Sequence, residues 1–267
     1  MITASFGGLL KDFRIRKDLS QRDVAYAMGW SEPSRLSRIE QGKTKKPTRE
    51  NVHQLFEAMR LSKIERNKLL LAGGYLPTEE EIVKIRHSAH TILTEWKYPV
   101  VLLDFSWRII DINDPANELY QMEKYFGKTI HKQVPNVLET IFHPIFINNI
   151  LQKMVILEEQ QAFLRRVLVH FRYAQQGRSR DQWYITLLNK MMKNVHFKQL
   201  WKEAQLESVD EINDFATNYG KKMFPHPSKN QLLCFNFFVV SALEDPRFDV
   251  EFHIPSDIET YQYFQKK

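Results

Sequence analysis

Apolar residues recur every three or four positions along the first 76 residues, which is the period of an amphipathic helix. In residues 6–13 and again in 52–59 they stand at i, i+3, i+4 and i+7. Capping-box pairs begin helices after Ser20 and Ser62, and glycines follow the apolar stretches. The pattern predicts an all-α domain of five short helices.

The period changes after Pro99. Residues 99–113, PVVLLDFSWRIIDIN, read as two strands with a tight turn near Asp104–Ser106. Residues 136–205 return to a helical period, and residues 231–243 and 248–254 read as paired strands. Strands, then helices, then strands predict an α+β domain with an antiparallel sheet.

The last predicted strand alternates strictly between apolar and polar residues. Phe248, Val250, Phe252 and Ile254 form one face, and Asp249, Glu251 and His253 the other. Side chains on a strand point alternately to its two faces. The pattern therefore predicts an apolar face toward the core and an acidic face toward solvent.

The chain accordingly divides into a helical domain at residues 1–76, a linker helix at 77–97 and an α+β domain at 98–267. Pro77 breaks the chain, and Thr78 with Glu81 caps the linker helix. Its apolar stripe admits two readings. The helix is either a lever or dimer contact, or it packs on its neighbour within the chain.

Charge is unevenly distributed. The net charge is +6, and residues 1–76 hold 15 Lys/Arg and 8 Asp/Glu. The basic surplus thus belongs wholly to the helical domain, which predicts binding to a polyanion there. A solubilising surface is the alternative reading of the same charge.

Composition indicates the cellular setting. No apolar run approaches the roughly 18 residues of a membrane span. The first residues lack the charged-then-apolar order of a signal peptide. Cys234 is the only cysteine, which excludes intramolecular disulfides. We expect a cytoplasmic protein of about two domains without a membrane partner.

Residues 20–47 place two helices, a glycine between them and a basic loop in sequence. With Gly29 as the turn, the small Ala25 lets the second of these helices approach closely. The outer side of that helix then fits the major groove, which is about 12 Å wide. The predicted DNA-binding residues are Gln21, Ser34, Arg35, Ser37, Arg38, Lys43, Thr44, Lys45 and Lys46.

The segment SQRDVAYAMG…LSRIEQGKTKKP resembles the helix-turn-helix of phage-repressor-type (XRE) regulators over residues 5–73. The resemblance implies that Ser34 and Arg38 meet base edges, while Gln21, Arg35 and the loop Lys43–Lys46 hold phosphates. One extra residue near Glu32-Pro33 separates the turn glycine from Ile39-Glu40, compared with the usual spacing. An alternative for Arg38 is an ion pair with Glu40 or Glu32.

The segment KYPVVLLDFSWRIIDINDPANELY resembles the opening of a PAS-type sensor domain. The whole chain is similar to MmyB-like regulators, through LSKIERNKLLLAGG at 61–74, residues 99–113, HFKQLW at 196–201 and FPHP at 224–227. The resemblance implies a one-component transcription regulator with a PAS-like ligand-binding domain. We expect a homodimer on a roughly palindromic operator.

A PAS-like sheet can enclose an apolar cavity with a few polar orienting groups. The predicted pocket residues are Trp107, Ile109, Asn113, Phe142, Phe146, Phe163, Val167, Phe171, Trp201, Phe235, Phe237 and Phe252. Each aromatic residue among them can instead be ordinary core, and Asn113 can instead tie down the following turn. The expected ligand is small and apolar, such as a fatty acid or another molecule with an acyl chain.

Catalytic motifs are absent from the sequence. It contains no GxSxG, Walker A, GxGxxG or HExxH pattern. His87 and His90 share a helix face without completing a metal site. PAS-type sensors can hold haem or flavin, but no ligating residue stands out. We expect neither an enzyme nor a resident cofactor; the alternative for the second domain is a dimerisation or protein-interaction module.

Overall fold

A computed structural model describes residues 5–44, 46–123, 135–149, 157–206, 222–226, 231–242 and 244–265. The chain divides into two compact units. The first is Met1–Thr78 together with Ser241–Arg247, and the second is Glu79–Val240 together with Phe248–Lys267. The helix expected as a separate linker therefore belongs to the second unit.

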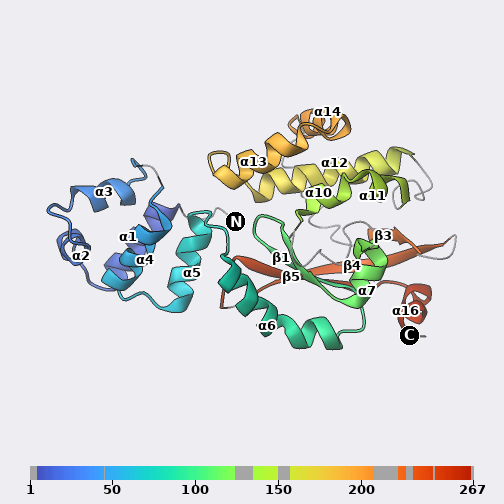
Figure 1. The fold of residues 1–267 in the computed structure, drawn as a ribbon, viewed down its shortest axis with the longest axis horizontal. Coiled ribbons are helices and arrows are strands. Elements are labelled where there is room, and N and C mark those ends of the chain that lie inside the picture. Colours follow the sequence, from blue (N-terminus) through green and yellow to red (C-terminus); the bar gives the residue numbers. More distant parts are fainter. Residues whose placement is uncertain are drawn as a thin grey trace. The chain divides into compact units, whose positions relative to one another are not determined.

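The first unit contains the five predicted helices (Figure 1). They are α1 (Phe6–Arg16), α2 (Gln21–Ala27), α3 (Ser34–Glu40), α4 (Arg49–Ala58) and α5 (Lys63–Ala72). Both predicted capping boxes form, at Ser20 with Asp23 and at Ser62 with Glu65. Gly29 separates α2 from α3 in the left-handed conformation, with φ of +70°. The helical prediction for this region is confirmed.

The core of the first unit comes from one apolar face of each helix. Leu10, Leu36 and Leu55 are fully buried in it. Gly7 sets how closely α1 approaches α3, because a Cβ at this position would lie 2.4 Å from the carbonyl oxygen of Ile39. The unit also includes Glu244, whose carbonyl oxygen accepts a hydrogen bond from Asn67 at 2.7 Å.

The second unit is built on a five-stranded sheet of order β2-β1-β5-β4-β3. Its strands are β1 (Val100–Asp104), β2 (Ile109–Ile112), β3 (Lys222–Pro225), β4 (Leu232–Ser241) and β5 (Phe248–Pro255). β1 pairs antiparallel with both β2 and β5, and β3 pairs antiparallel with β4. This confirms the predicted α+β class with an antiparallel sheet, although β3 had no clear signal in the sequence.

Helices cover both faces of this sheet (Figure 1). They are α6 (Glu79–Glu95), α7 (Asp114–Tyr120), α10 (Val137–Ile141), α11 (Pro144–Asn149), α12 (Leu157–Ala174), α13 (Gln182–Met191), α14 (Val195–Ala204) and α16 (Ile258–Gln265). α6 lies along one face, and the layer of α10 to α14 lies along the other.

The helix α6 is fastened to the sheet by Arg86. Its Nη2 donates to the carbonyl oxygen of Ile110 at 2.7 Å, and its Nε lies 3.7 Å from the carboxylate of Asp111. Ile82 and Ala89 are buried on the same helix. The apolar stripe of this helix therefore packs within the second unit.

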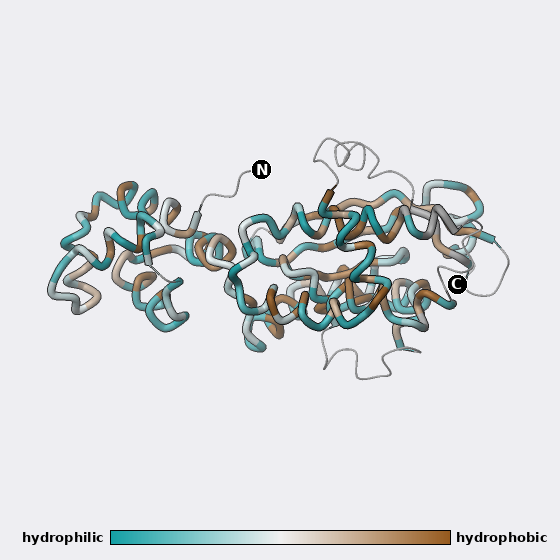
Figure 2. Tube along the Cα trace, turned by 90° about the horizontal axis from the view of Figure 1, so that it is seen from above, coloured by the Kyte–Doolittle hydropathy of each residue, from teal (hydrophilic) through white to brown (hydrophobic). Residues whose placement is uncertain are grey.

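Hydrophobic and hydrophilic positions are interspersed along the helices of both units, as Figure 2 shows. Each helix thus buries one side rather than its whole circumference. Within the described ranges, none of the helices combines the length and the apolar character needed to cross a membrane.

Candidate DNA-binding face and ligand cavity

The helix-turn-helix presents one side of α3 to solvent. Leu36 and Ile39 are buried on its inner side, and Ala25 is fully buried on α2 where the two helices meet. Ser34, Arg35 and Arg38 are exposed, and Ser37 is half-buried. The predicted inner and outer sides of α3 therefore agree with the structure.

A buried ion pair and a hydrogen bond to the same carboxylate hold α1, α2 and α3 together. Nε of Arg14 on α1 lies 2.6 Å from Oε1 of Glu40 on α3, and its Nη2 lies 3.0 Å from Oε2. Nε2 of Gln21 donates to the same carboxylate at 2.8 Å. Hydrogen bonding to Glu40 raises the pKa of Arg14. This triad holds α3 at a fixed angle to α1 and α2.

Sequence reasoning missed Arg14, although a signal was present. Arg14 follows Leu10 by one helical turn and therefore lies on the apolar face of α1. A charged residue at such a position needs a buried partner of opposite charge. Glu40, next to the buried Ile39, supplies it.

Most predicted DNA contacts on α2 and α3 also make bonds within the protein. Gln21 holds Glu40, Oγ of Ser34 donates to Glu32 at 3.2 Å, and the guanidinium of Arg35 lies 4.5 Å from the ring centroid of Trp30. Oγ of Ser37 accepts a hydrogen bond from Gln41 at 3.0 Å. These interactions orient the side chains on the outer side of α2 and α3.

For the exposed Arg38, the alternative to DNA contact was an ion pair with Glu40 or Glu32, and the structure tests both pairs. Glu40, one possible ion-pair partner, is engaged by Arg14 and Gln21. Glu32, the other, accepts a hydrogen bond from Ser34. Neither carboxylate is paired with Arg38 in the described structure, which leaves its guanidinium at the surface.

The basic loop after α3 has two kinds of lysine. Lys43 is exposed, directly after Gly42, whose φ is +66°. Lys46 instead donates to the carbonyl oxygen of Gly74 at 3.0 Å and lies 4.2 Å from the ring centroid of Tyr75. Thr44 is half-buried, and Lys45 lies outside the described residues.

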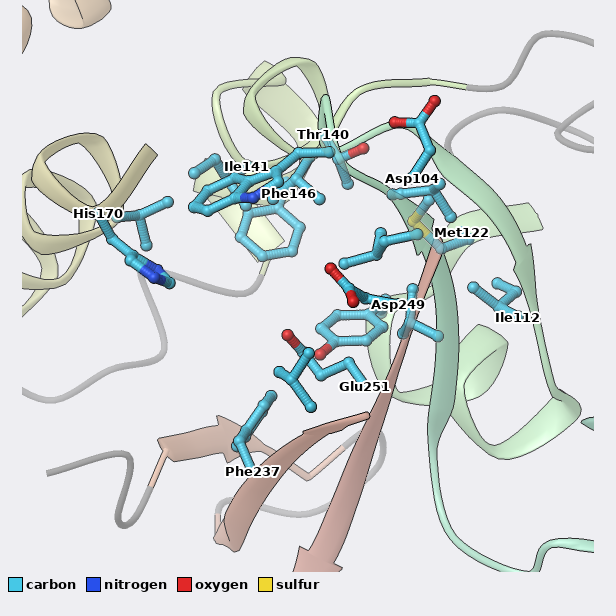
Figure 3. A pocket seen from close by; sticks show the side chains of 18 of the residues that line it. Asp104, Ile112, Met122, Thr140, Ile141, Phe146, His170, Phe237, Asp249 and Glu251 are labelled. Atoms are coloured by element: carbon cyan, nitrogen blue, oxygen red, sulfur yellow. The ribbon is translucent and has the colours of Figure 1, made fainter. Parts of the chain in front are cut away.

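The second unit holds a cavity of about 280 Å³ between the sheet and the helical layer (Figure 3). Most of its wall is apolar or aromatic. The lining residues are Val101, Leu103, Asp104, Trp107, Ile109, Ile112, Tyr120, Met122, Val137, Thr140, Ile141, Phe146, Phe163, Val167, His170, Ala174, Phe224, Phe237, Val239, Asp249 and Glu251.

The cavity brings together half of the predicted pocket residues. Those on its wall are Trp107, Ile109, Phe146, Phe163, Val167 and Phe237. They come from β2, from the turn before it, from α11 and α12, and from β4. As ligand contacts they remain a prediction.

The other six predicted pocket residues lie elsewhere. Phe142, Phe171 and Trp201 are buried in the core of the helical layer, and Phe235 packs in the cluster beneath α16. Phe252 lies against Trp96, with 5.3 Å between the ring centroids. Each of these five aromatic residues packs against other side chains and does not line the cavity.

Asn113 stabilises the local backbone through four hydrogen bonds. Its Oδ1 accepts hydrogen bonds from the backbone N–H of Val100 and of Ala116, which caps α7, and its Nδ2 donates to the carbonyl oxygens of Trp96 and Tyr98. Since the side chain is buried and fully engaged, it serves the turn rather than the cavity.

The turn between β1 and β2 positions Trp107. The carboxylate of Asp104 accepts hydrogen bonds from Ser106 and from Arg108, whose Nε lies 2.6 Å away. Trp107 adopts a φ of +66°, which a bulky residue rarely does. Its ring lies 5.2 Å from those of His170 and Phe171. Such local strain concentrates at functional sites.

The polar side chains of β5 lie in a different environment from the predicted one. Asp249 and Glu251 were expected toward solvent, yet they line the cavity, and His253 on the same side is fully buried. The alternation itself is correct. The apolar side is packed as predicted at Phe248, but the polar side is covered as well, because helices lie on both faces of the sheet.

His253 joins this face to α7. Its Nε2 is hydrogen-bonded to the hydroxyl of Tyr120 and lies 3.6 Å from Oε1 of Glu251. Burial, and secondarily the charge of Glu251, raises the pKa of Tyr120 well above its usual value. The tyrosine therefore keeps its proton at neutral pH.

Within the described ranges, no three His, Cys, Asp or Glu side chains converge as a metal ion requires. The sites that remain are an exposed basic helix face in one unit and a mostly apolar cavity in the other. Together they define the class of helix-turn-helix proteins that carry a separate ligand-binding domain.

Comparison with protein families supports this class. Residues 5–69 match a helix-turn-helix domain, and residues 85–246 match the ligand-binding domain of MmyB-like transcription regulators. The second match covers more than half of the chain, which therefore belongs to the MmyB-like transcription regulators. It is a DNA-binding regulator, and its family is not one of enzymes. No curated protein matches the chain.

Proposed function

We propose that this protein is a one-component regulator whose second domain senses a small, mostly apolar molecule. The observation that carries the proposal is the cavity of about 280 Å³ within the matched ligand-binding domain. Its volume is near the lower end of small-molecule sites, which run from about 300 Å³. Apolar side chains dominate its wall, and an acyl chain suits that part of it.

The DNA-reading face is the exposed side of α3. Arg38 reaches base edges in the major groove, and Lys43 contacts the phosphate backbone. Dimeric helix-turn-helix proteins place two such helices about 34 Å apart, so the protein binds a roughly palindromic operator as a homodimer. Phe238 and Val240, on one face of β4, expose 52% and 54% of their surface and offer an apolar contact between copies.

Ligand binding acts on DNA binding through the dimer. A ligand shifts an equilibrium only by its differential affinity for the two arrangements. The cavity wall includes β1, β2 and β5 residues, and α6 is bonded to β2 through Arg86. A ligand that displaces these strands therefore biases the position of α6, which follows the DNA-binding unit in the chain.

Two measurements on the purified full-length protein test this function. Selection from a random duplex library should yield a palindromic DNA site, bound with a steep salt dependence. Native mass spectrometry should find a dimer that carries a small molecule, which leaves on mild activation. A dimer that never carries or accepts a small molecule would contradict the sensor role.

The alternative is a second domain that serves only for dimerisation. The exposed Phe238 and Val240 favour it, because such apolar strips mark interaction surfaces. Phe238→Ser together with Val240→Ser should abolish the dimer under both readings. Only under this alternative does filling the cavity leave operator affinity unchanged in the presence of small molecules. Under the sensor reading, filling the cavity changes the response to ligand.

A further inference from the structure

The turn between α2 and α3 holds Trp30 in one place. The backbone N–H of Gly29 donates to the carbonyl oxygen of Tyr26, and that of Trp30 donates to the carbonyl oxygen of Ala25, both at 2.9 Å. With Gly29 at a φ of +70°, these two hydrogen bonds form the Schellman motif that ends many helices. The side chain of Trp30 is half-buried and packs against the core of the first unit. The backbone and the ring are therefore both fixed.

The ring of Trp30 holds the side chain of Arg35. This arginine is the second residue of α3, and its side chain is exposed. Its guanidinium carbon lies over the Trp30 ring, 4.5 Å from the ring centroid. A cation within about 6 Å of an aromatic face is attracted by the ring, and tryptophan gives the strongest attraction of this kind. Trp30 therefore contacts the core and a surface cation at the same time.

The contact with the ring leaves Arg35 able to bind an anion. A guanidinium has five N–H donors in a rigid plane, and two of them fit the oxygens of a phosphate in parallel hydrogen bonds. In the part of the chain that the structure describes, the side chain of Arg35 forms neither a hydrogen bond nor an ion pair. Arg14 shows the opposite case, because Glu40 engages both its Nε and its Nη2. Arg14 thus serves the fold, whereas Arg35 keeps its donors for a partner outside the protein.

Arg35 also lies next to the residue that is predicted to read bases. Arg35 and Arg38 are both exposed and stand three residues apart, so they are neighbours on the surface of α3. Two guanidinium groups at this spacing repel each other. Attraction to the Trp30 ring gives Arg35 a defined position in spite of this repulsion. Because a long side chain that is ordered in advance loses less entropy on binding, the ring prepares Arg35 for its partner.

We propose that Trp30 is a positioning residue for DNA binding and that it holds Arg35 against a backbone phosphate of the duplex. The inference rests on the proposed function, namely that the exposed side of α3 meets DNA. Backbone phosphates recur at the same spacing in every sequence, so a cation that is fixed before binding suits them. Trp30 does not itself touch the duplex and acts through the guanidinium of Arg35.

Arg35→Met tests the phosphate contact, because methionine keeps an unbranched side chain and removes the charge. Fluorescence anisotropy measures binding of the full-length protein to the selected duplex and to a duplex of scrambled sequence, at several salt concentrations. Both affinities should fall by the same factor, about 5-fold or more, and the salt slope should decrease by about one ion. A loss confined to the selected duplex would assign Arg35 to a base edge and contradict the phosphate contact.

Two variants of Trp30 test the positioning role. Trp30→Leu keeps an apolar side chain in the turn and removes the ring. It should weaken binding to both duplexes by about 3- to 10-fold with the parental salt slope, because Arg35 keeps its charge and loses only its fixed position. Trp30→Tyr retains an aromatic face and should stay within about 2-fold of the parent. The Arg35→Met protein is the matched control, in which Trp30→Leu should cause no further loss of affinity.

The outcomes separate this inference from the proposed function. If Trp30→Leu weakens binding equally in the parent and in Arg35→Met, the tryptophan acts through the fold of the turn, and the inference is wrong. It is also wrong if Trp30→Leu or Arg35→Met retains the parental affinity while Lys43→Ala weakens binding, and the DNA-binding face then stands without it. If Arg35→Met, Arg38→Ala and Lys43→Ala all retain the parental affinity and salt slope, this face does not bind DNA, and both proposals fail.

Discussion

The two functional regions of this protein are constructed in opposite ways. The proposed DNA-binding face lies at the surface, is basic, and comes from one stretch of the chain, of which residues 34–44 and 46 are described. The cavity lies within the second unit and is mostly apolar, and its wall comes from segments spread between Val101 and Glu251. Charged groups are part of both regions: Glu40 is buried beneath α3, and the half-buried carboxylates of β5 line the cavity.

The difference teaches that a charged side chain can hold helices together in one region and form part of a cavity wall in the other. Glu40 is enclosed by Arg14 and Gln21, and its carboxylate holds three helices together. Asp249 and Glu251 instead belong to the wall of the cavity. Loss of the first should therefore unfold a unit, and loss of the second should change what it binds.

The largest effect is expected from Glu40→Ala. It leaves Arg14 buried without its partner, which costs about 3–5 kcal/mol of unfolding free energy. The first unit should lose its cooperative unfolding transition and its DNA binding, whereas the unfolding transition of the second unit persists. Differential scanning calorimetry and a DNA-binding titration measure these effects.

The control for this variant is Glu57→Gln. Its ion pair with Arg66 is solvent-exposed, so the loss should be at most about 1 kcal/mol. Equal destabilisation by the two variants would remove the claim that Glu40 organises the helix-turn-helix.

Asn113→Ala comes next and tests whether this residue is architectural. It removes four hydrogen bonds at the start of α7 and should destabilise the second unit by about 3 kcal/mol. Urea unfolding gives this cost. The affinity for octan-1-ol, a neutral apolar probe of the cavity, measured below the unfolding transition, should stay unchanged. A selective loss of this affinity in a stable variant would instead favour a ligand role for Asn113.

Arg38→Ala sharpens the comparison on the DNA side. Loss of one base contact should cost about 1–3 kcal/mol on the selected duplex and relax sequence preference. Lys43→Ala should weaken binding to all duplexes and flatten the salt dependence by about one ion. Fluorescence anisotropy at several salt concentrations separates the two. Parental affinity and salt slope in both variants would show that this face does not bind DNA.

Lys46 is a poorer probe of phosphate contact than Lys43. Its ammonium bonds the carbonyl oxygen of Gly74 and lies over Tyr75, so Lys46→Ala also loosens the end of α5. Any loss of DNA affinity in this variant must be compared with its thermal stability.

The smallest effect concerns Tyr120 at alkaline pH. Its raised pKa means that the folded protein keeps a proton which the unfolded chain loses near pH 10, so stability falls as the pH rises through that value. Between about pH 8 and about pH 10.5, Tyr120→Phe should reduce this fall by less than about 1 kcal/mol. Urea unfolding at both pH values measures the change. If Tyr120→Phe leaves the fall in stability unaltered, Tyr120 is not the group responsible for it.

Sequence reasoning succeeded better for the first unit than for the cavity of the second unit. Helix period, capping boxes and Gly29 are local signals, and they identify α1 to α5 and the outer side of α3. Arg14 was overlooked because its partner Glu40 is distant in sequence. The short β3, with no alternation long enough to detect, was also missed.

The cavity could be predicted only in part. Trp107 and Phe163 are large and apolar, so composition suggested them, but it could not separate them from Phe171 and Trp201, which the core takes. Asp249 and Glu251 were assigned to solvent because alternation alone does not tell which side of a doubly covered sheet encloses a cavity. That information is in the packing of helices far along the chain.

Occupancy of the cavity should change the affinity of the first unit for DNA. This effect is tested by the dissociation constant for the selected duplex, measured with and without saturating octan-1-ol, a neutral apolar probe of the cavity. The parent is compared with Val167→Trp, in which a larger side chain fills the cavity. We expect at least about a 5-fold change in the parent, which is the lower range of allosteric coupling, and no change in Val167→Trp. An identical dissociation constant in the parent, with octan-1-ol demonstrably bound, would contradict the account.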